Sequence, residues 1–238
     1  MKVSQGQVTS NLANERPPHS SPEWKKTHLI LIRHGLSEHN RAAQIVNEDG
    51  TTSYNFRYNS NPEHPNYRPS NLLEEGRVKL VETAKKLHSL GVQAINTIAY
   101  VSPLPRTQQS AEILIQHEVI REAYTTDNRI IEAQAGELEG EFGLYPEISR
   151  EEKNEKKYES RELFAKRVKE FVLTLQDSLS KTDTKNVVIV SHDGVLARMV
   201  QLFDPSAEVA MTPGSYLEYD LSFNPTTPKE LGKLTLSK

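Results

Sequence analysis

The sequence predicts a three-layer α/β/α fold, in which a central, mostly parallel sheet lies between two layers of helices. Three apolar runs of strand length, residues 28–33, 94–101 and 186–191, are each followed by a segment with helical periodicity. A basic residue or group also lies at or just past the end of each run. Because ligands of such sheets bind at the carboxyl ends of the strands, the repeated pattern predicts one basic site at that edge.

The composition fits one domain whose basic site is local. The 238 residues include 29 Lys and Arg against 32 Asp and Glu, for a formal net charge of -3. No overall positive field is available to attract nucleic acid or an anionic membrane. The sequence contains no cysteine, which excludes disulfides, thiolate metal sites and a cysteine nucleophile.

Residues 1–26 are expected to form a disordered N-terminal tail, followed by a single domain over residues 27–238. The tail is polar and lacks the apolar segment of a secretion signal, and no later apolar run is long enough to span a bilayer. The default expectation is therefore a cytoplasmic protein that binds neither membrane nor nucleic acid. The sequence leaves its oligomeric state open.

Helices and strands are expected to alternate after the first strand and a polar, proline-containing loop over 41–71. The segment 74–91 has helical spacing, with Leu80, Ala84 and Leu87 on one face. The long helix expected later in the chain carries a core-facing apolar stripe behind first turns that are almost wholly charged. The other expected elements are helices over 107–117, 153–179 and after the third strand, a short strand at 124–130, and strands at 214–223 and 233–237.

Four side chains lie at or just past the ends of the three strands. Arg33 and His34 end the first strand, Arg106 follows the second, and His192 follows the third. If the strands are neighbours, these distant segments form one small cationic pocket that suits a small anion. The N-termini of the helices that begin there add backbone donors.

The motifs around these residues resemble those of the histidine phosphatase superfamily, in its phosphoglycerate mutase-like branch (branch 1). The segment RHGLSEHN, residues 33–40, is similar to the family signature Arg-His-Gly-x-Ser/Thr-x-x-Asn. The resemblance covers about residues 29–221 and implies a phosphoglycerate mutase-like fold and a phosphatase that needs no metal or other cofactor. Further segments match in the family's order: LLEEGRVKL, SPLPRTQQSAEIL, RIIEAQAGELEG, YESRELFAKRV and VIVSHDG.

The resemblance and the chemistry of phosphoryl transfer assign a role to each residue type. A neutral His34 would attack phosphorus and form a phosphohistidine that water then hydrolyses. Arg33 and Arg106 carry planar guanidinium groups suited to the phosphoryl oxygens. Further donors to the phosphate are expected from His192, Asn40 and Ser37.

Two carboxyl groups are candidates for the general acid. The resemblance places Glu132 in the position of the family's acid, a role that requires burial to raise its pKa. Most of this branch has Gly after the second His, whereas this chain has Asp193, and the acid phosphatase branch uses an Asp there as proton donor. The structural alternatives are that Asp193 N-caps the helix beginning near Gly194, and that Asn40 caps or turns its own segment.

The expected reaction is hydrolysis of a small phosphomonoester, with a phosphoprotein substrate not excluded. Phosphoglycerate mutases follow their acid with an Arg and, two residues later, a Tyr, where this chain has Ala133 and Ala135. Mutase-type phosphotransfer is therefore disfavoured and stays an alternative, as does a catalytically weak phospho-ligand-binding member. A metal site is not expected, since the histidines form neither an H-x-H nor an HExxH pattern. The loop 41–71 either covers the site and selects the substrate or is a longer surface loop.

Overall fold

The sheet that carries the predicted site has six strands in the order β5-β4-β7-β1-β8-β9. The computed structural model describes residues 23–46, 48–49, 52–55, 68–138, 144–145, 155 and 157–237. β4, β7 and β1 lie side by side in parallel, and β8 and β9 extend the sheet in antiparallel pairing. The strands are β1 (Lys25–Arg33), β4 (Thr97–Val101), β5 (Thr125–Thr126), β7 (Asn186–Ser191), β8 (Tyr216–Phe223) and β9 (Lys233–Leu236).

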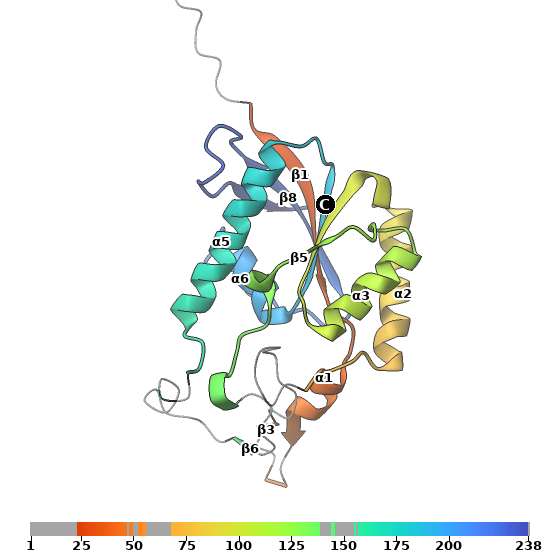
Figure 1. Ribbon diagram of the computed structural model, residues 1–238, viewed down its shortest axis with the longest axis vertical. Helices are drawn as coiled ribbons and strands as arrows, with labels where there is room; N and C mark the ends of the chain where they lie inside the picture. Colours follow the sequence, from red (N-terminus) through yellow and green to blue (C-terminus); the bar gives the residue numbers. More distant parts are fainter. Residues whose placement is uncertain are drawn as a thin grey trace, which may run out of the picture.

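Helices cover both faces of this sheet, which confirms the predicted three-layer α/β/α arrangement. In Figure 1, α5 (Arg161–Ser180) and α6 (Asp193–Gln201) lie on one side of the strands, and α2 (Glu74–Ser89) and α3 (Pro105–Gln116) lie on the other. Alternate residues of β1 enter two separate hydrophobic cores: Leu29 and Leu31 belong to the α5/α6 side, and Ile30 and Ile32 to the α2/α3 side. All four side chains are buried, as the continuous apolar run of a two-sided strand predicts.

Several element boundaries differ from the sequence prediction. The long helix begins at Arg161 instead of 153, because the Ser160 hydroxyl accepts a hydrogen bond from the Leu163 amide at 3.1 Å and caps the helix there. β4 begins at Thr97, because residues 94–96 form a short 3₁₀ turn with its own capping box. β5 has only two residues, and a second 3₁₀ turn at Asn128–Ile130 follows it.

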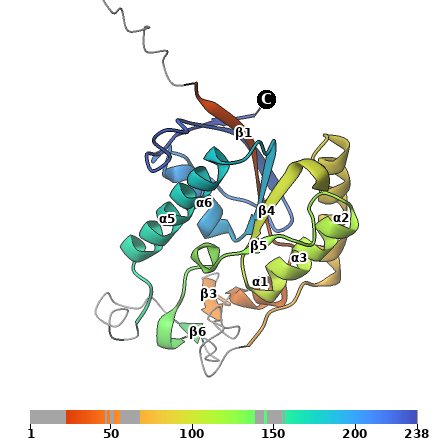
Figure 2. The same ribbon diagram turned by 45° about the horizontal axis from the view of Figure 1, so that its top comes forward.

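The segment 41–71, expected to be a polar loop, contains regular structure in its described part. α1 (Glu38–Ala43) leads into β2 (Gln44–Val46), which pairs with β3 (Thr52–Asn55), and β3 pairs with β6 (Leu144–Tyr145). Figures 1 and 2 both place this small antiparallel sheet beside α1, at the end of the molecule opposite the C-terminus. The prediction that the loop covers the site concerns mainly residues 47, 50–51 and 56–67, which lie outside the described residues, as do residues 1–22 of the expected tail.

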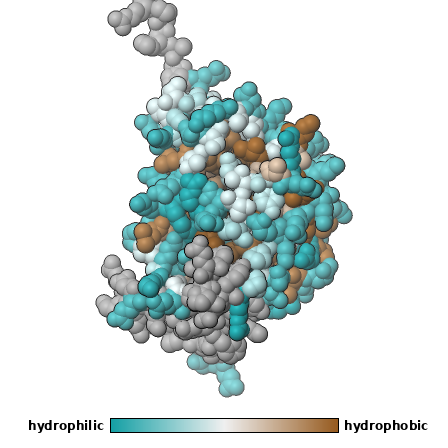
Figure 3. Space-filling view, in the orientation of Figure 1, coloured by the Kyte–Doolittle hydropathy of each residue, from teal (hydrophilic) through white to brown (hydrophobic). Residues whose placement is uncertain are grey.

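The face of the molecule seen in Figure 3 is mainly polar in its described part. In the view of Figure 3, hydrophilic residues cover most of the described area and hydrophobic side chains are scattered between them. Among the described helices, none combines the length and the apolar character needed to cross a membrane.

Close backbone contact fixes the loop after β1 against α2. A Cβ atom at Gly76 would lie 2.3 Å from Leu36 O and 2.5 Å from Leu36 N, so only glycine permits this approach. The Leu73 amide donates a hydrogen bond to Leu36 O at 2.9 Å, and the Gly35 amide donates to Ser110 Oγ on α3 at 3.2 Å. The loop that contains His34 is therefore held between the two helices of this layer.

Replacement of Gly76 by alanine is expected to destabilise the protein, because the helix or the loop must move to admit the methyl group. Overpacking of this kind costs about 1–3 kcal/mol, or about 2–4 °C in Tm for each kcal/mol at this chain length. Thermal unfolding followed by circular dichroism measures the change. Val78→Ala, at a 53% exposed position of the same helix, is the control and should shift Tm by less than about 2 °C. An unchanged Tm for Gly76→Ala would show that the helix and the loop are not in such close contact.

Candidate active site

The carboxyl ends of β1, β4 and β7 bring the predicted site residues together. The strand register pairs Arg33 with Ser191 and Val101 with Val190, so the residues just beyond the three strands are neighbours. The rings of His34 and His192 lie edge to face with centroids 5.1 Å apart. Arg106, in the first turn of α3, reaches the same place. The convergence predicted from the three strand ends is therefore present.

The hydrogen bonds of His34 fix its tautomer. Nδ1 lies 2.7 Å from the Gly35 carbonyl oxygen, which can only accept, so Nδ1 carries the proton. Nε2 accepts a hydrogen bond from Arg106 Nε at 3.2 Å and so carries the lone pair. Burial and then the Arg106 cation hold the pKa of His34 well below its usual 6.5. His34 is therefore a neutral imidazole at pH 7.

His192 lies behind His34 and is fully buried. Its Nε2 is hydrogen-bonded to Ser102 Oγ at 2.8 Å, and its Nδ1 has no hydrogen-bond partner within the described part of the chain. Burial, followed by the nearby Arg106 charge, lowers its pKa well below 6.5. His34 and His192 are thus uncharged, and the positive charge comes from the arginines.

A cavity of about 470 Å³ opens above His34. Arg33 and Arg106 both line it, and the guanidinium of Arg33 is fixed by a hydrogen bond to the Met211 carbonyl. Arg33 Nε is buried and finds no partner among the described residues, which leaves it as a donor for an anion. The lining residues are Arg33, His34, Leu36, His39, Asn40, Arg106, Glu132, Asp193, Gly194 and Pro213.

Asn40 and Ser37 bond to each other at the start of α1. Asn40 Oδ1 accepts hydrogen bonds from the Ser37 hydroxyl at 2.9 Å and from the Ser37 backbone amide at 3.2 Å. In return, the backbone amide of Asn40 donates to Ser37 Oγ at 3.4 Å. Asn40 therefore takes part in the cap that precedes α1, which is the contact that the structural alternative describes. Asn40 also lines the cavity, and the Nδ2 group of its side chain is the donor that it could offer to a ligand. Ser37 is fully buried and does not belong to the lining.

Glu132 has the environment that a general acid requires. Burial raises the pKa of its carboxyl group, against the opposing effects of the Ala133 amide, Arg106 and Arg33. Oε1 accepts a hydrogen bond from the Ala133 amide at 2.9 Å. A Cβ atom at Gly194 would lie 3.2 Å from this same oxygen, so the glycine leaves room for the carboxyl group at the cavity wall.

Asp193 makes different contacts from those expected. The predicted N-cap role is wrong, because α6 begins one residue earlier: His192 is the N-cap and Asp193 is the first helical residue. Asp193 Oδ1 accepts a hydrogen bond from the Met211 amide at 2.8 Å, and Oδ2 lies 3.9 Å from Arg33 Nη1. Two residues of the cavity lining therefore bind the backbone of Met211: Asp193 binds its amide and Arg33 binds its carbonyl oxygen.

His39 is a lining residue that the sequence analysis missed. Burial, followed by the charge of Arg106, lowers its pKa from 6.5 to about 4, and its backbone amide donates to Ser70 Oγ at 2.8 Å. The signal available in the sequence is its place within the segment 33–40, directly before Asn40. The family signature leaves that position open, so only the packing of α1 shows that the imidazole reaches the cavity.

Comparisons with known proteins place the chain in a family. It matches the histidine phosphatase superfamily (branch 1) over residues 29–211 and therefore belongs to this superfamily. Among curated proteins, no sequence matches.

Solved structures of phosphatases and mutases share the fold. A mycobacterial glucosyl-3-phosphoglycerate phosphatase has a TM-score of 0.63 at 18% identity, with 90% of this chain and 98% of that chain covered. A phosphoglycerate mutase from Bacillus anthracis also has a TM-score of 0.63 at 18% identity, with coverage of 90% and 92%. A mycobacterial hydrolase has a TM-score of 0.61 at 18% identity, with 90% of both chains covered. At these identities the likeness concerns the fold alone.

The site histidines are expected to make the protein less stable as the pH falls. The folded-state pKa of His39 is about 4, below the unfolded value of 6.5, so on acidification the unfolded state binds its proton first. Its contribution to stability is present above pH 6.5 and is lost towards pH 4, at up to about 1.4 kcal/mol per pH unit. Urea unfolding at pH 7, 6, 5 and 4 should show a shallower decline for His39→Gln than for the wild type. Equal slopes would contradict the lowered pKa.

Proposed function

We propose that this protein is a metal-independent phosphatase that hydrolyses a small phosphomonoester through a phosphohistidine at His34. The observation that carries the proposal is the state of His34: a neutral ring whose lone pair lies on Nε2, beside two guanidinium groups that line one cavity. A nucleophilic nitrogen next to fixed positive charge is the arrangement that phosphoryl transfer requires.

In the first step, Arg106 Nε–H exchanges its hydrogen bond to His34 Nε2 for one to a phosphoryl oxygen, which frees the lone pair. His34 Nε2 then attacks phosphorus, and the bond from phosphorus to the leaving oxygen breaks. Arg33, Arg106 and the Asn40 side-chain amide, which line the cavity, bind the phosphoryl oxygens. His192 is fully buried and does not belong to the lining, and its unpartnered Nδ1 is the donor that it offers to a phosphoryl group bound against His34. The leaving oxygen takes the electron pair of the broken bond and the proton of the Glu132 carboxyl group. The products of this step are the alcohol, phosphohistidine and a Glu132 carboxylate.

In the second step, a water molecule attacks the phosphohistidine. The Glu132 carboxylate takes a proton from that water as the oxygen bonds to phosphorus, and the electron pair of the nitrogen–phosphorus bond returns to His34 Nε2. Inorganic phosphate leaves, and His34 and Glu132 regain their starting states. The arginines stay charged throughout, so they stabilise each intermediate without taking part in proton transfer.

The contacts of the two carboxyl groups favour Glu132 over Asp193 as the acid. Burial raises the pKa of Glu132 and so favours its protonated form, whereas Asp193 accepts a hydrogen bond from the Met211 amide and faces Arg33. We assign Asp193 the task of holding Arg33 and residue 211 in place. The mutase alternative is less favoured, since Ala133 and Ala135 stand where mutases carry the Arg and Tyr that hold their substrate.

Wild-type protein is expected to release phosphate from p-nitrophenyl phosphate in the presence of EDTA. His34→Ala should lower kcat by at least about 10³-fold, because it removes the nucleophile. His88→Ala, a histidine on α2 outside the cavity, is the control and should keep the wild-type rate. Loss of wild-type turnover in EDTA, or full activity of His34→Ala, would contradict the proposal. Transfer of phosphate to a second phosphate ester without net release would support the mutase alternative.

Substrates whose leaving groups differ in basicity distinguish the roles of Glu132 and Asp193. Phenyl phosphate releases a more basic oxygen than p-nitrophenyl phosphate and therefore depends more on the acid. Glu132→Gln should lower kcat/KM about 10²-fold or more for phenyl phosphate and much less for p-nitrophenyl phosphate. Asp193→Asn should lower both rates by a similar factor, because it disturbs Arg33. The reverse pattern would make Asp193 the acid.

A further inference from the structure

We propose that Arg167 and Glu159, an ion pair between α5 and the segment before it, are positioning residues for the acid Glu132. Neither side chain belongs to the cavity lining, and nothing in the resemblance assigns either one a role. The inference rests on the proposed function, in which Glu132 donates the proton to the leaving group. It concerns how the loop that carries Glu132 is held at a fixed distance from His34.

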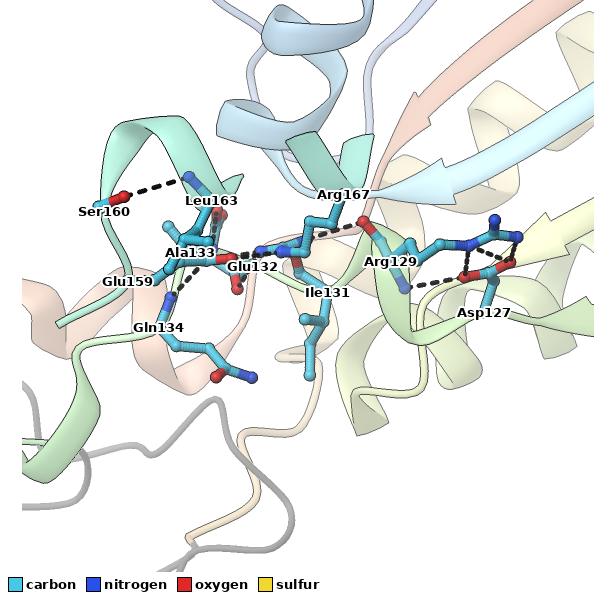
Figure 4. A network of polar contacts seen from close by, with 10 residues as sticks. All are labelled: Asp127, Arg129, Ile131, Glu132, Ala133, Gln134, Glu159, Ser160, Leu163 and Arg167. Atoms are coloured by element: carbon cyan, nitrogen blue, oxygen red, sulfur yellow. Dashed lines mark hydrogen bonds and ion pairs between the residues drawn. The ribbon is translucent and has the colours of Figure 1, made fainter. Parts of the chain in front are cut away.

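The guanidinium group of Arg167 binds both this loop and Glu159 (Figure 4). Nη1 donates to the carbonyl oxygens of Arg129 at 2.7 Å and Ile131 at 2.8 Å, and Nη2 donates to the carbonyl oxygen of Glu132 at 3.1 Å. Nε and Nη2 also bind the two carboxylate oxygens of Glu159, at 2.6 and 2.8 Å. The rigid guanidinium group therefore fixes three backbone carbonyl groups, and the last of the three belongs to Glu132, the proposed acid.

Glu159 holds the other side of the acid. Its Oε2 accepts a hydrogen bond from the Gln134 amide at 3.3 Å, and its own backbone amide donates to the Gln134 carbonyl oxygen at 3.0 Å. Between these anchors, the Ala133 amide donates to Glu132 Oε1. The backbone is thus bound to the ion pair before and after Glu132, and the carboxyl group is bound to the backbone. Figure 4 shows this chain of contacts running from α5 to the acid.

Burial makes a purely stabilising role a poor explanation of the pair. The side chains of Arg167 and Glu159 are only 17% and 13% exposed, and a buried ion pair often contributes no more stability than apolar residues of the same size. An apolar pair could not bind the carbonyl groups of residues 129, 131 and 132. The Arg167 guanidinium also lies 4.7 Å from the ring centre of Phe164, whose Cζ would be 3.9 Å from a Cβ atom at Gly194 in the cavity wall.

The same region contains a second ion pair that serves as a control. Arg129 binds Asp127 through Nε at 3.0 Å and Nη2 at 2.6 Å, and it donates to Thr174 Oγ1 on α5 at 2.7 Å. The Asp127–Arg129 pair, which is drawn in Figure 4, therefore also ties a loop to α5 through Thr174. Asp127 Oδ1 also accepts a hydrogen bond from the Arg129 amide, and the Arg129 carbonyl oxygen is the Arg167 contact farthest along the chain from the acid. Because the hydrogen bonds of its side chains do not reach residues 132–134, the pair should affect the acid much less than Glu159 does.

The test compares Glu159→Gln with Asp127→Asn, two changes that remove one charge from each pair at nearly constant size. Both enzymes are assayed on p-nitrophenyl phosphate and phenyl phosphate. Glu159→Gln should lower kcat/KM about 10- to 100-fold for phenyl phosphate, since a small displacement of a catalytic group has effects of this size, and less than about threefold for p-nitrophenyl phosphate. Asp127→Asn should leave the ratio of the two rates as in the wild type.

A double variant shows whether the effect passes through the acid. If Glu159 acts by placing Glu132, the double variant Glu132→Gln/Glu159→Gln should have the same ratio of kcat/KM on the two substrates as Glu132→Gln alone. The two effects would then be non-additive. Arg167→Lys, which keeps the charge and loses the guanidinium group, should change the ratio in the same direction as Glu159→Gln. It provides a second measurement if Glu159→Gln does not fold.

The outcomes separate this inference from the proposed function. Equal losses on both substrates in Glu159→Gln and Arg167→Lys, with a selective loss in Glu132→Gln, would overturn the positioning role and leave the phosphatase mechanism intact. The positioning role is also overturned if the Glu132 and Glu159 effects simply add. If Glu132→Gln itself shows no selective loss, the assignment of the acid in the proposed function fails first.

Discussion

The neutral state of the buried His34 ring is the constraint on which the rest of the site depends. A protonated imidazole there would face two arginines inside the protein, and it would have no lone pair to attack phosphorus. The Gly35 carbonyl and the Arg106 Nε–H place the proton on Nδ1 and the lone pair on Nε2. Burial, followed by the positive charge of Arg106, keeps the histidine neutral, and that same charge is the one that an anionic substrate needs.

The fold supplies this arrangement through strand register and close backbone contact. Parallel pairing of β1, β7 and β4 aligns the first residues after each strand, and the contact between Gly76 and Leu36 fixes the loop that carries His34. The proposed acid, Glu132, lies in a different kind of element, a segment without long strands or helices. The backbone of that segment is held by hydrogen bonds from Arg167 of α5 to the carbonyl oxygens of residues 129, 131 and 132.

The parts of the molecule that follow local rules could be predicted from the sequence, and the parts that depend on tertiary contacts could not. Apolar runs predicted the three parallel strands, and the basic residues after them predicted where His34, His192 and Arg106 meet. The start of α5 was missed because a charged segment with helical spacing hides the cap at Ser160. The roles of His39 and Arg167 depend on which groups surround them in three dimensions, and neither spacing nor residue type contains that information.

The most direct test of the account is to trap the covalent intermediate. The protein is mixed rapidly with a ³²P-labelled phosphomonoester, quenched in alkaline denaturant, in which phosphohistidine survives, and digested for peptide mapping. If His34 is the nucleophile, we expect one labelled peptide that contains residues 33–40, with phosphate on Nε2 of His34. Phosphate on His39 or His192, on Nδ1 of His34, or on no histidine while substrate is being consumed would contradict it.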